Sequence, residues 1–161
     1  MDVGVGRTGV AHGLRCNVHR ACVRTRRSAT SLNRSLVGKT YDAATFVVDA
    51  ERVERFARAV DHPREGVPPT FVTAPEIQAG LANAIADADL GVELARVLHG
   101  EQTYEWTRPL ERGETVTATS TILDIRGRPS LEFLTIRTEI RAVDGTLVCF
   151  ATTTLIQRRP A

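Results

Sequence analysis

The segment of residues 99–114 constrains the fold most strongly, because it separates two stretches with different hydrophobic periods. It reads His-Gly-Glu-Gln-Thr-Tyr-Glu-Trp-Thr-Arg-Pro-Leu-Glu-Arg-Gly-Glu and joins a polar bend to a short strand that carries Tyr104 and Trp106. One long alanine-rich helix is expected before it, and the period after it is two, which is typical of β-strands. This order predicts a single α+β domain in which one helix is wrapped by an antiparallel sheet.

The expected central helix begins near Thr73, which together with Glu76 has the spacing of a capping box. Apolar residues then follow at helical spacing, namely Ile77, Leu81, Ala84, Ile85 and Ala88. The other faces carry mostly small residues, including Ala79, Gly80, Ala82 and Ala86. A helix that is small on nearly all sides suits close contact with strands, so we expect it at the centre of the fold.

A strand and a shorter helix are predicted ahead of the central helix. Residues 41–48 alternate, with Ala44, Phe46 and Val48 on one face. Asp49 is placed to cap a helix whose apolar stripe is Val53, Phe56, Ala57 and Val60. This helix should end before residues 61–63, because the residue that precedes a proline is disfavoured in the helical region.

The C-terminal half is predicted to consist of antiparallel strands. Residues 116–125 and 131–142 read as strands, and Asp144-Gly145 is a strong hairpin signal before a last strand at 146–157. That last strand is apolar on both faces, which indicates a central position or a covering partner. Open sheet edges favour pairing with a second molecule, so we expect an oligomer.

Charge divides the chain into a leader, residues 1–34, and a body, residues 35–161. The leader holds seven arginines against one acid, for a net charge of +6, whereas the body holds 14 basic and 18 acidic side chains, for −4. The leader is expected to be disordered. Its composition resembles that of an organelle transit peptide. The alternative is that the start codon has been assigned too far upstream. The body gives no electrostatic case for nucleic acid, and no apolar run is long enough to span a membrane.

The cysteines and histidines do not indicate a disulfide framework or a metal centre. His12, Cys16, His19 and Cys22 are spaced like a zinc set, but no framework around them would fix tetrahedral geometry, so we read them as coincident residues. Cys149 lies in an apolar strand and is expected to be buried. No metal and no redox cofactor is implied, and a cytoplasmic location is expected for the body.

Three motifs resemble the MaoC-like N-terminal dehydratase domain family, including the non-catalytic subunits of the actinobacterial (3R)-hydroxyacyl-ACP dehydratase. They are Gly-Val-Pro-Pro-Thr-Phe-Val at 66–72, the segment 99–114, and Asp-Gly-Thr-Leu-Val with Ala-Thr-Thr-Thr-Leu at 144–148 and 151–155. The resemblance covers residues 36–157 in the family's order. It implies a hot-dog fold, which pairs with a second hot-dog subunit.

The resemblance also implies a reaction, the interconversion of a (3R)-3-hydroxyacyl thioester and a trans-2-enoyl thioester. Catalytic members use an Asp and a His, a few residues apart in the loop before the central helix. Here that loop is short, and Asp61 and His62 are adjacent, so their side chains should point apart in an extended loop. We therefore interpret them as a helix stop and a turn, with a catalytic role as the alternative.

Other candidate residues are weighed in the same way. His99 followed by Glu101 could form an acid/base pair, although the resemblance makes this segment a bend. Tyr104 and Trp106 share a face and are expected to line an acyl channel or an interface, or to lie in the core. Thr70, Phe71 and Thr73 lie where the resemblance places the acyl channel. Arg108 could meet a phosphopantetheine phosphate.

The preferred hypothesis is a dehydratase or hydratase subunit that binds the acyl chain while a catalytic hot-dog partner supplies the Asp/His pair. CoA and acyl carrier protein are both possible carriers of the thioester. Two alternatives remain: a non-enzymatic acyl-thioester-binding homodimer and a hot-dog thioesterase, because a fold does not settle function.

Overall fold

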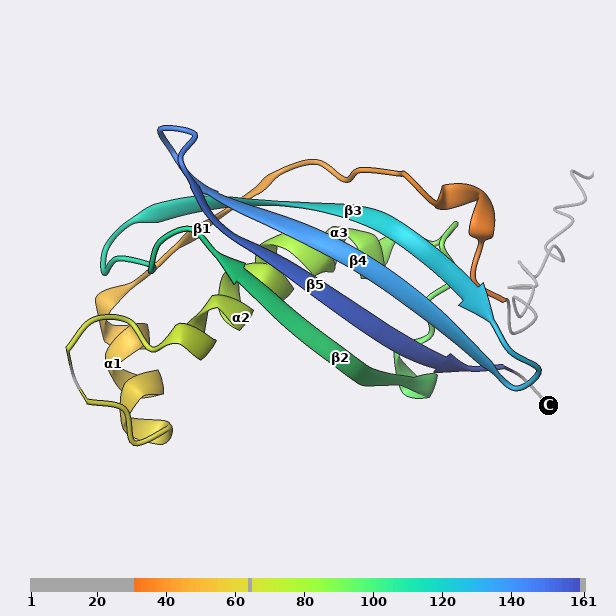
Figure 1. The fold of residues 1–161 in the computed structure, drawn as a ribbon, viewed down its shortest axis with the longest axis horizontal. Helices are drawn as coiled ribbons and strands as arrows, with labels where there is room; N and C mark the ends of the chain where they lie inside the picture. Colours follow the sequence, from red (N-terminus) through yellow and green to blue (C-terminus); the bar gives the residue numbers. More distant parts are fainter. Residues whose placement is uncertain (1–30, 64, 160–161) are drawn as a thin grey trace, which may run out of the picture.

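The computed structural model describes residues 31–63 and 65–159, and within them the strands form one five-stranded antiparallel sheet (Figure 1). The spatial order of the strands is β1-β3-β4-β5-β2. Their bounds are Ala44–Val47 for β1, Val97–Trp106 for β2, Thr115–Gly127 for β3, Leu131–Ala142 for β4 and Leu147–Arg158 for β5. The predicted α+β arrangement, with four strands after the central helix, is confirmed.

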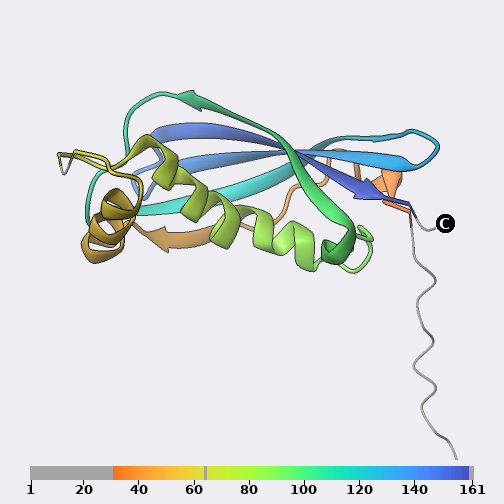
Figure 2. The same cartoon turned by 90° about the horizontal axis from the view of Figure 1, so that it is seen from below.

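One helical segment, residues 69–86, runs along a single face of this sheet (Figure 2). It consists of η2 (Pro69–Val72), α2 (Thr73–Pro75), the π-helical turn η3 (Glu76–Leu81) and α3 (Ala82–Ala86). The small residues of this helix predicted a close contact with the sheet, and Gly80 allows that contact. A Cβ there would lie 2.5 Å from Thr138 Cγ2 on β4 and 2.9 Å from Ser120 Oγ on β3.

The predicted apolar stripe of the helix is confirmed at Leu81 and Ala84, which are buried, but the prediction was wrong at the start of the helix. The Thr73 hydroxyl donates to Thr70 O at 2.8 Å, and Glu76 is buried instead of capping. Ile77, expected on the apolar stripe, is 52 % exposed. The π-helical turn explains the error, because its i→i+5 hydrogen bonds widen the turn and shift the buried face away from the 3.6-residue period.

The elements before the central helix follow the sequence closely. The helix α1 (Ala50–Ala59) begins at Asp49, whose side chain accepts a hydrogen bond from Arg52 N at 2.8 Å. The short turn η1 (Arg34–Leu36) is capped by Asn33. Leu32 is buried at 4 % exposure, so packed structure includes part of the range assigned to the leader. Residues 1–30, with His12, Cys16, His19 and Cys22, lie outside the described residues.

The core occupies the space between the helix and the sheet, in two adjoining clusters. One surrounds Phe71 near the start of the helix, with Phe46, Val53, Val72, Leu110 and Val116. The other surrounds Leu81 near its end, with Leu90, Ile122, Leu134 and Ile136. Three side chains on one face of β4, Leu134, Ile136 and Ile140, are buried in this core, and Ala142 on the same face is partly buried.

The two ends of the sheet carry different elements. Figures 1 and 2 show α1 and the start of the central helix at one end, and η1 with the β3–β4 turn at the other. The strand β5 lies between β4 and β2, so the prediction of a central position is confirmed. The 3₁₀ turn η4 (Leu94–Arg96) leads into β2, which is an edge strand. No helix in residues 31–63 and 65–159 is long and apolar enough to cross a membrane.

Candidate functional site

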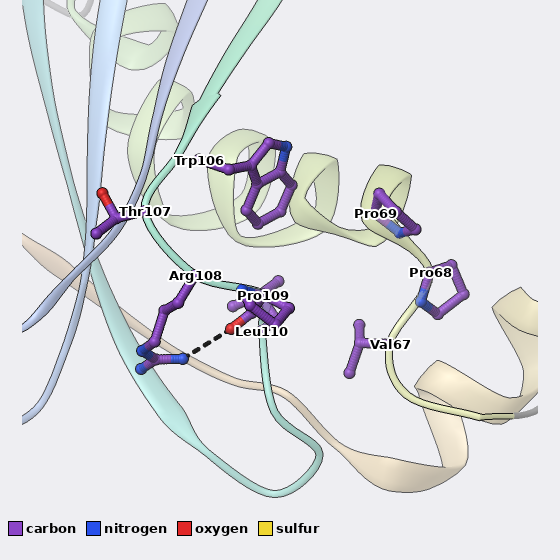
Figure 3. Close-up of a pocket in the computed structure, with 8 residues that line it drawn as sticks. All are labelled: Val67, Pro68, Pro69, Trp106, Thr107, Arg108, Pro109 and Leu110. Carbon is purple, nitrogen blue, oxygen red and sulfur yellow. Dashed lines mark hydrogen bonds between the residues drawn. The ribbon is translucent and has the colours of Figure 1, made fainter.

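An apolar pocket of ≈ 340 Å³ lies at the start of the central helix (Figure 3). The loop before the helix forms one side of it, and the end of β2 with the segment after it forms the other. Its lining consists of Val67, Pro68, Pro69, Trp106, Thr107, Arg108, Pro109 and Leu110. None of these residues is a carboxylate, histidine or cysteine, so the pocket has groups that bind an apolar ligand and none that would exchange a proton at neutral pH.

Arg108 is the charged residue of the pocket, and Glu114 already neutralises it. The guanidinium makes a two-point contact with that carboxylate, at 2.7 and 3.2 Å, and also donates to Pro109 O at 2.8 Å. The hydrogen bond to Glu114 raises the pKa of Arg108. Such paired geometry fixes both side chains. Arg108 therefore braces the turn after β2.

A buried polar cluster lies next to the pocket, between the π-helical turn and the strands β2 and β5. We define the Glu76 cluster as Glu76, Gln102, Tyr104 and Thr153. Glu76 is 1 % exposed and accepts hydrogen bonds from the Tyr104 hydroxyl at 3.0 Å and the Gln102 amide at 3.1 Å. The Thr153 hydroxyl contacts both Glu76 Oε1 and Gln102 Oε1. Three neutral donors thus surround one buried carboxyl group, and no cationic side chain among the described residues bonds to it.

The burial of this cluster and the charge of Glu76 shift the acidity of two neighbours. Burial, and then repulsion by Glu76, raise the pKa of Tyr104 far above its ordinary value of 10.0. The same two causes, in the same order, raise the pKa of the Cys149 thiol from 9.0 to about 11. Both groups therefore remain neutral at physiological pH.

The raised pKa of Cys149 predicts a loss of stability in alkali. In the unfolded chain the thiol ionises near pH 9, whereas in the folded protein it stays protonated up to about pH 11. The folded state binds the thiol proton more tightly than the unfolded state does. The contribution of this proton to the free energy of unfolding is therefore complete below pH 9 and is lost as the pH rises to about 11. Urea unfolding at pH 8, 9.5 and 11 should show the fall. The decrease in the free energy of unfolding with pH should be smaller in Cys149→Ala. An equal decrease in the two proteins would contradict its assignment to the Cys149 thiol.

Two backbone irregularities meet at the Glu76 cluster. The π-helical turn carries Glu76, and a β-bulge interrupts the pairing of β2 with β5 between His99 and Glu101. Both kinds of irregularity occur preferentially at functional sites. The rings of Tyr104 and Trp106 lie with their centroids 6.2 Å apart, and so connect the cluster with the pocket.

The structure brings together some of the predicted substrate-lining residues and separates others. Tyr104 and Trp106 lie side by side, with Trp106 lining the pocket and Tyr104 bonded to Glu76. Phe71 is buried against the rings of Phe46 and Phe56. Phe71 and Thr73 line a different hollow, beside α1, and Thr70 is exposed.

Asp61 and His62 form the end of α1. Asp61 has a left-handed backbone, at φ 52, and its N–H faces Arg58 O at 3.5 Å. His62 N donates to Ala57 O at 2.9 Å. These are the two hydrogen bonds of a Schellman motif, which closes a helix by satisfying its last carbonyl groups. The backbone geometry of both residues is thus explained by helix termination.

His99 and Glu101, the other candidate acid/base pair, face different surroundings. The His99 ring lies 3.1 Å from Gln102 Oε1, which adds it to the edge of the Glu76 cluster. Glu101 follows the bulge and lines a separate cleft near the β3–β4 turn. The described residues contain no group of three or more His, Cys, Asp or Glu arranged to hold a metal ion.

Sequence reasoning missed Glu76, Gln102 and Thr153. Glu76 was read as a surface cap because Thr73 stands three residues before it. A signal was present, since Glu76 is four residues from Gly80 and shares the helix face that packs on the sheet. A carboxylate on the small-residue face of a central helix needs donors from the facing strands, and both Tyr104 and Gln102 have the β2 positions to supply them.

Comparison with known proteins places the fold and the family. A family model for the FAS1-like dehydratase domain region matches residues 61–151. A UPF0336 protein of Streptomyces coelicolor is 34% identical over 145 residues, covering 80% of this chain and 96% of that protein. One of Thermobifida fusca is 31% identical, with 81% and 97% covered.

Solved structures share the architecture. The HadBC (3R-hydroxyacyl-ACP dehydratase) complex of Mycobacterium tuberculosis matches with a TM-score of 0.65 and 23% identity, over 80% of this chain and 99% of that one. A MaoC-like dehydratase from Rhodospirillum rubrum matches with a TM-score of 0.55 and 18% identity, over 78% and 94%. The single helix on an antiparallel sheet is therefore the hot-dog fold, as the sequence predicted.

Proposed function

This chain belongs to the FAS1-like dehydratase-region family, and on that premise we propose that it is a subunit of a (3R)-hydroxyacyl-thioester dehydratase or enoyl-thioester hydratase. It holds the acyl chain, and a catalytic hot-dog partner supplies the groups that transfer protons. The observation that carries the proposal is the composition of the pocket. An apolar ligand fits beside Trp106 and Leu110, whereas no acid or base lines that pocket.

The residues available for catalysis support the same division of labour. Dehydration needs a base at C2 of the acyl group and an acid at the leaving hydroxyl. Asp61 and His62 terminate α1, and Glu76 is too deeply buried to meet a substrate. Tyr104 is held neutral and its hydroxyl is committed to Glu76. This arrangement supports substrate binding without complete acid/base machinery.

An exposed strand edge supports a hot-dog partner. Within the described residues, β2 pairs on one side with β5, which leaves the backbone groups of its other edge open to a second strand. Large apolar side chains lie exposed along β2 and the neighbouring helix, namely Leu98 at 63 %, Ile77 at 52 % and Trp106 at 38 %. An open edge with apolar neighbours is a template for strand pairing between subunits.

The test is hydration of a trans-2-enoyl thioester by the purified chain, alone and after co-expression with a catalytic hot-dog subunit. We expect no turnover above background from the chain alone, and an activity of the complex that exceeds that of the partner alone. Turnover by the isolated chain, abolished in Asp61→Asn or His62→Ala, would overturn the proposal. Binding without turnover in every combination would favour a non-enzymatic homodimer, and release of free thiol would favour a thioesterase.

A further inference from the structure

The open edge of β2 carries two rows of side chains that differ in chemistry. Residues 101–106 pair with β5 in an unbroken register. Gln102 and Tyr104 point toward the central helix, because both bond to Glu76. Side chains alternate along a strand, so those between them point away from the helix. These side chains are the outer row of β2, which is exposed and consists of Glu101, Thr103 and Glu105.

The backbone of β2 determines how closely a second strand would approach the outer row. Thr107 N donates to Val148 O at 2.9 Å, so the odd-numbered residues of this stretch bond to β5. The alternating pattern of an antiparallel ladder then directs the N–H and C=O groups of Gln102, Tyr104 and Trp106 to the open edge. A strand that pairs there faces the outer row at the non-hydrogen-bonded positions, where opposite Cα atoms are about 4.5 Å apart. Side chains of the two strands would therefore be in direct contact.

Pairing of β2 with a second copy of itself would bring carboxylates together. Copies related by a twofold axis place residue i opposite j and j opposite i, and opposite residues share a face of the sheet. In a register centred on Thr103, Glu101 faces Glu105 of the other copy, and this contact occurs twice. In a register centred on either glutamate, that residue faces its own copy. Registers centred on Gln102 or Tyr104 place glutamates on the diagonal. Like charges on opposite strands are destabilising.

Contacts within the chain neutralise these two carboxylates incompletely. Glu105 lies 3.4 Å from Arg137, and its side chain remains 61 % exposed. The Arg137 guanidinium carbon also lies 3.9 Å from the centroid of the Phe150 ring, which holds this side chain over β5. Glu101 forms no ion pair within residues 31–63 and 65–159. An exposed pair at this distance contributes little, so both glutamates are available to an incoming strand.

The inner side of the same edge is apolar. Leu98 and Trp106 on β2 and Ile77 on the central helix are exposed, and burial of neighbouring apolar groups favours association. The outer row opposes pairing with a second copy, whereas a cation opposite each glutamate would pair with it. The strand that fits this edge is therefore apolar on its helix side and basic on its outer side.

We propose that β2 selects a hot-dog partner whose edge strand carries arginine or lysine opposite Glu101 and Glu105. The same two glutamates disfavour pairing between two copies of this chain. Repulsion in one complex and attraction in the other together give specificity. This inference rests on the proposed function, which supplies the partner, and it adds the chemistry by which β2 recognises that partner.

The first test uses two versions of the full chain. Glu101→Lys/Glu105→Lys provides a hot-dog subunit of known sequence with a basic edge strand. In an equimolar mixture with the wild-type chain at low salt, native mass spectrometry should show mixed dimers about ten-fold above the random ratio. Glu51→Lys/Glu65→Lys reverses the same charge on α1 and in the loop after it, and should mix at random. A random proportion in the first mixture, or no mixed dimer, would overturn the inference.

The second test neutralises the outer row and keeps its size. Sedimentation equilibrium of Glu101→Gln/Glu105→Gln at low salt should give a homodimer with a Kd about ten-fold below that of the wild-type chain. Added salt should strengthen the wild-type homodimer and change the variant less, because salt screens repulsion. Glu51→Gln/Glu65→Gln has the same net charge and should associate like the wild type. Equal Kd values for the wild type and Glu101→Gln/Glu105→Gln would contradict the inference.

The third test uses the catalytic hot-dog subunit of the hydration assay. Calorimetric titration of that subunit into Glu101→Gln/Glu105→Gln should show about ten-fold weaker binding than into the wild-type chain, with kcat of the complex unchanged. An active wild-type complex whose affinity is the same with the variant would overturn the inference and leave the proposed function standing. Absence of an active wild-type complex would count against the proposed function, and the mixture of the two chain versions would still decide whether β2 prefers a basic strand.

Discussion

Glu76→Ala is expected to lower the free energy of unfolding by about 3–5 kcal/mol, the largest effect of any single substitution considered. The change removes the acceptor of the half-buried Tyr104 hydroxyl and Gln102 amide, and it leaves the Thr153 hydroxyl with Gln102 Oε1 as its remaining acceptor. It also opens a void between the helix and the sheet. Urea unfolding at pH 7 measures the loss, and a decrease below about 1 kcal/mol would show that the cluster does not hold the helix to β2 and β5.

Two further variants separate the cluster from generic effects of losing a carboxylate. Glu105→Ala removes an exposed carboxylate from the same strand, β2, and should change stability by less than about 0.5 kcal/mol. Tyr104→Phe removes one of the three donors. The double variant Glu76→Ala/Tyr104→Phe should therefore cost less than the sum of the single changes, by about 1–2 kcal/mol. Strict additivity would mean that the hydroxyl and the carboxylate do not interact.

Gly80→Ala is expected to lower the free energy of unfolding by about 1–2 kcal/mol. The added Cβ would lie 2.5 Å from Thr138 Cγ2, and overpacking of this kind costs roughly 1–3 kcal/mol. The higher helix propensity of alanine offsets up to about 1 kcal/mol of this cost, because glycine is a poor helix former. Thermal or urea unfolding gives the sign directly, and a more stable Gly80→Ala protein would show that the helix and sheet are less closely packed than the structure has them.

A second substitution tests the cause of that loss. Thr138→Ser removes the Cγ2 methyl group that the new Cβ would meet and keeps the hydroxyl that bonds to Ser120 at 2.7 Å. Gly80→Ala/Thr138→Ser should then be more stable than Gly80→Ala alone. If Thr138→Ser destabilises both backgrounds equally, the conflict does not lie at that methyl group.

Much of the fold follows from local chemistry that a sequence displays. Asp49 is a capping residue before an amphipathic stretch, and it caps α1. Asp144-Gly145 forms the turn between β4 and β5, with Gly145 at φ 87. In both cases the residues that decide the structure are neighbours along the chain, so their spacing carries the necessary information.

The Glu76 cluster and the register of the central helix depend instead on contacts between distant residues. Glu76 faces the sheet because a π-helical turn rotates it there, and its donors come from strands 26 to 77 residues away. A period of 3.6 residues cannot show such a turn. Thr73 and Glu76 matched a capping box locally, but burial of the carboxyl among three donors competes with that arrangement and determines the structure.

The residues that line the pocket could be predicted only in part. Trp106 could be selected as a lining residue because it is a large aromatic side chain in a short strand, and the structure places it at the pocket. Thr70, Phe71 and Thr73 were selected by their place before the helix, yet Pro68 and Pro69 are the residues of that segment that line this pocket. The 3₁₀ turn η2 turns Phe71 into the core, and neither composition nor spacing shows that rotation.

We propose above that this chain binds the acyl group and leaves proton transfer to its partner. The kcat for enoyl-thioester hydration by a complex that carries Asp61→Asn/His62→Ala in this chain tests it most directly. Asn is tolerated in the left-handed region, so the α1 terminus should survive the change. We expect a kcat within two-fold of the wild-type complex, whereas Trp106→Ala should raise KM. A fall in kcat of a hundred-fold or more in the folded Asp61→Asn/His62→Ala complex would contradict the claim.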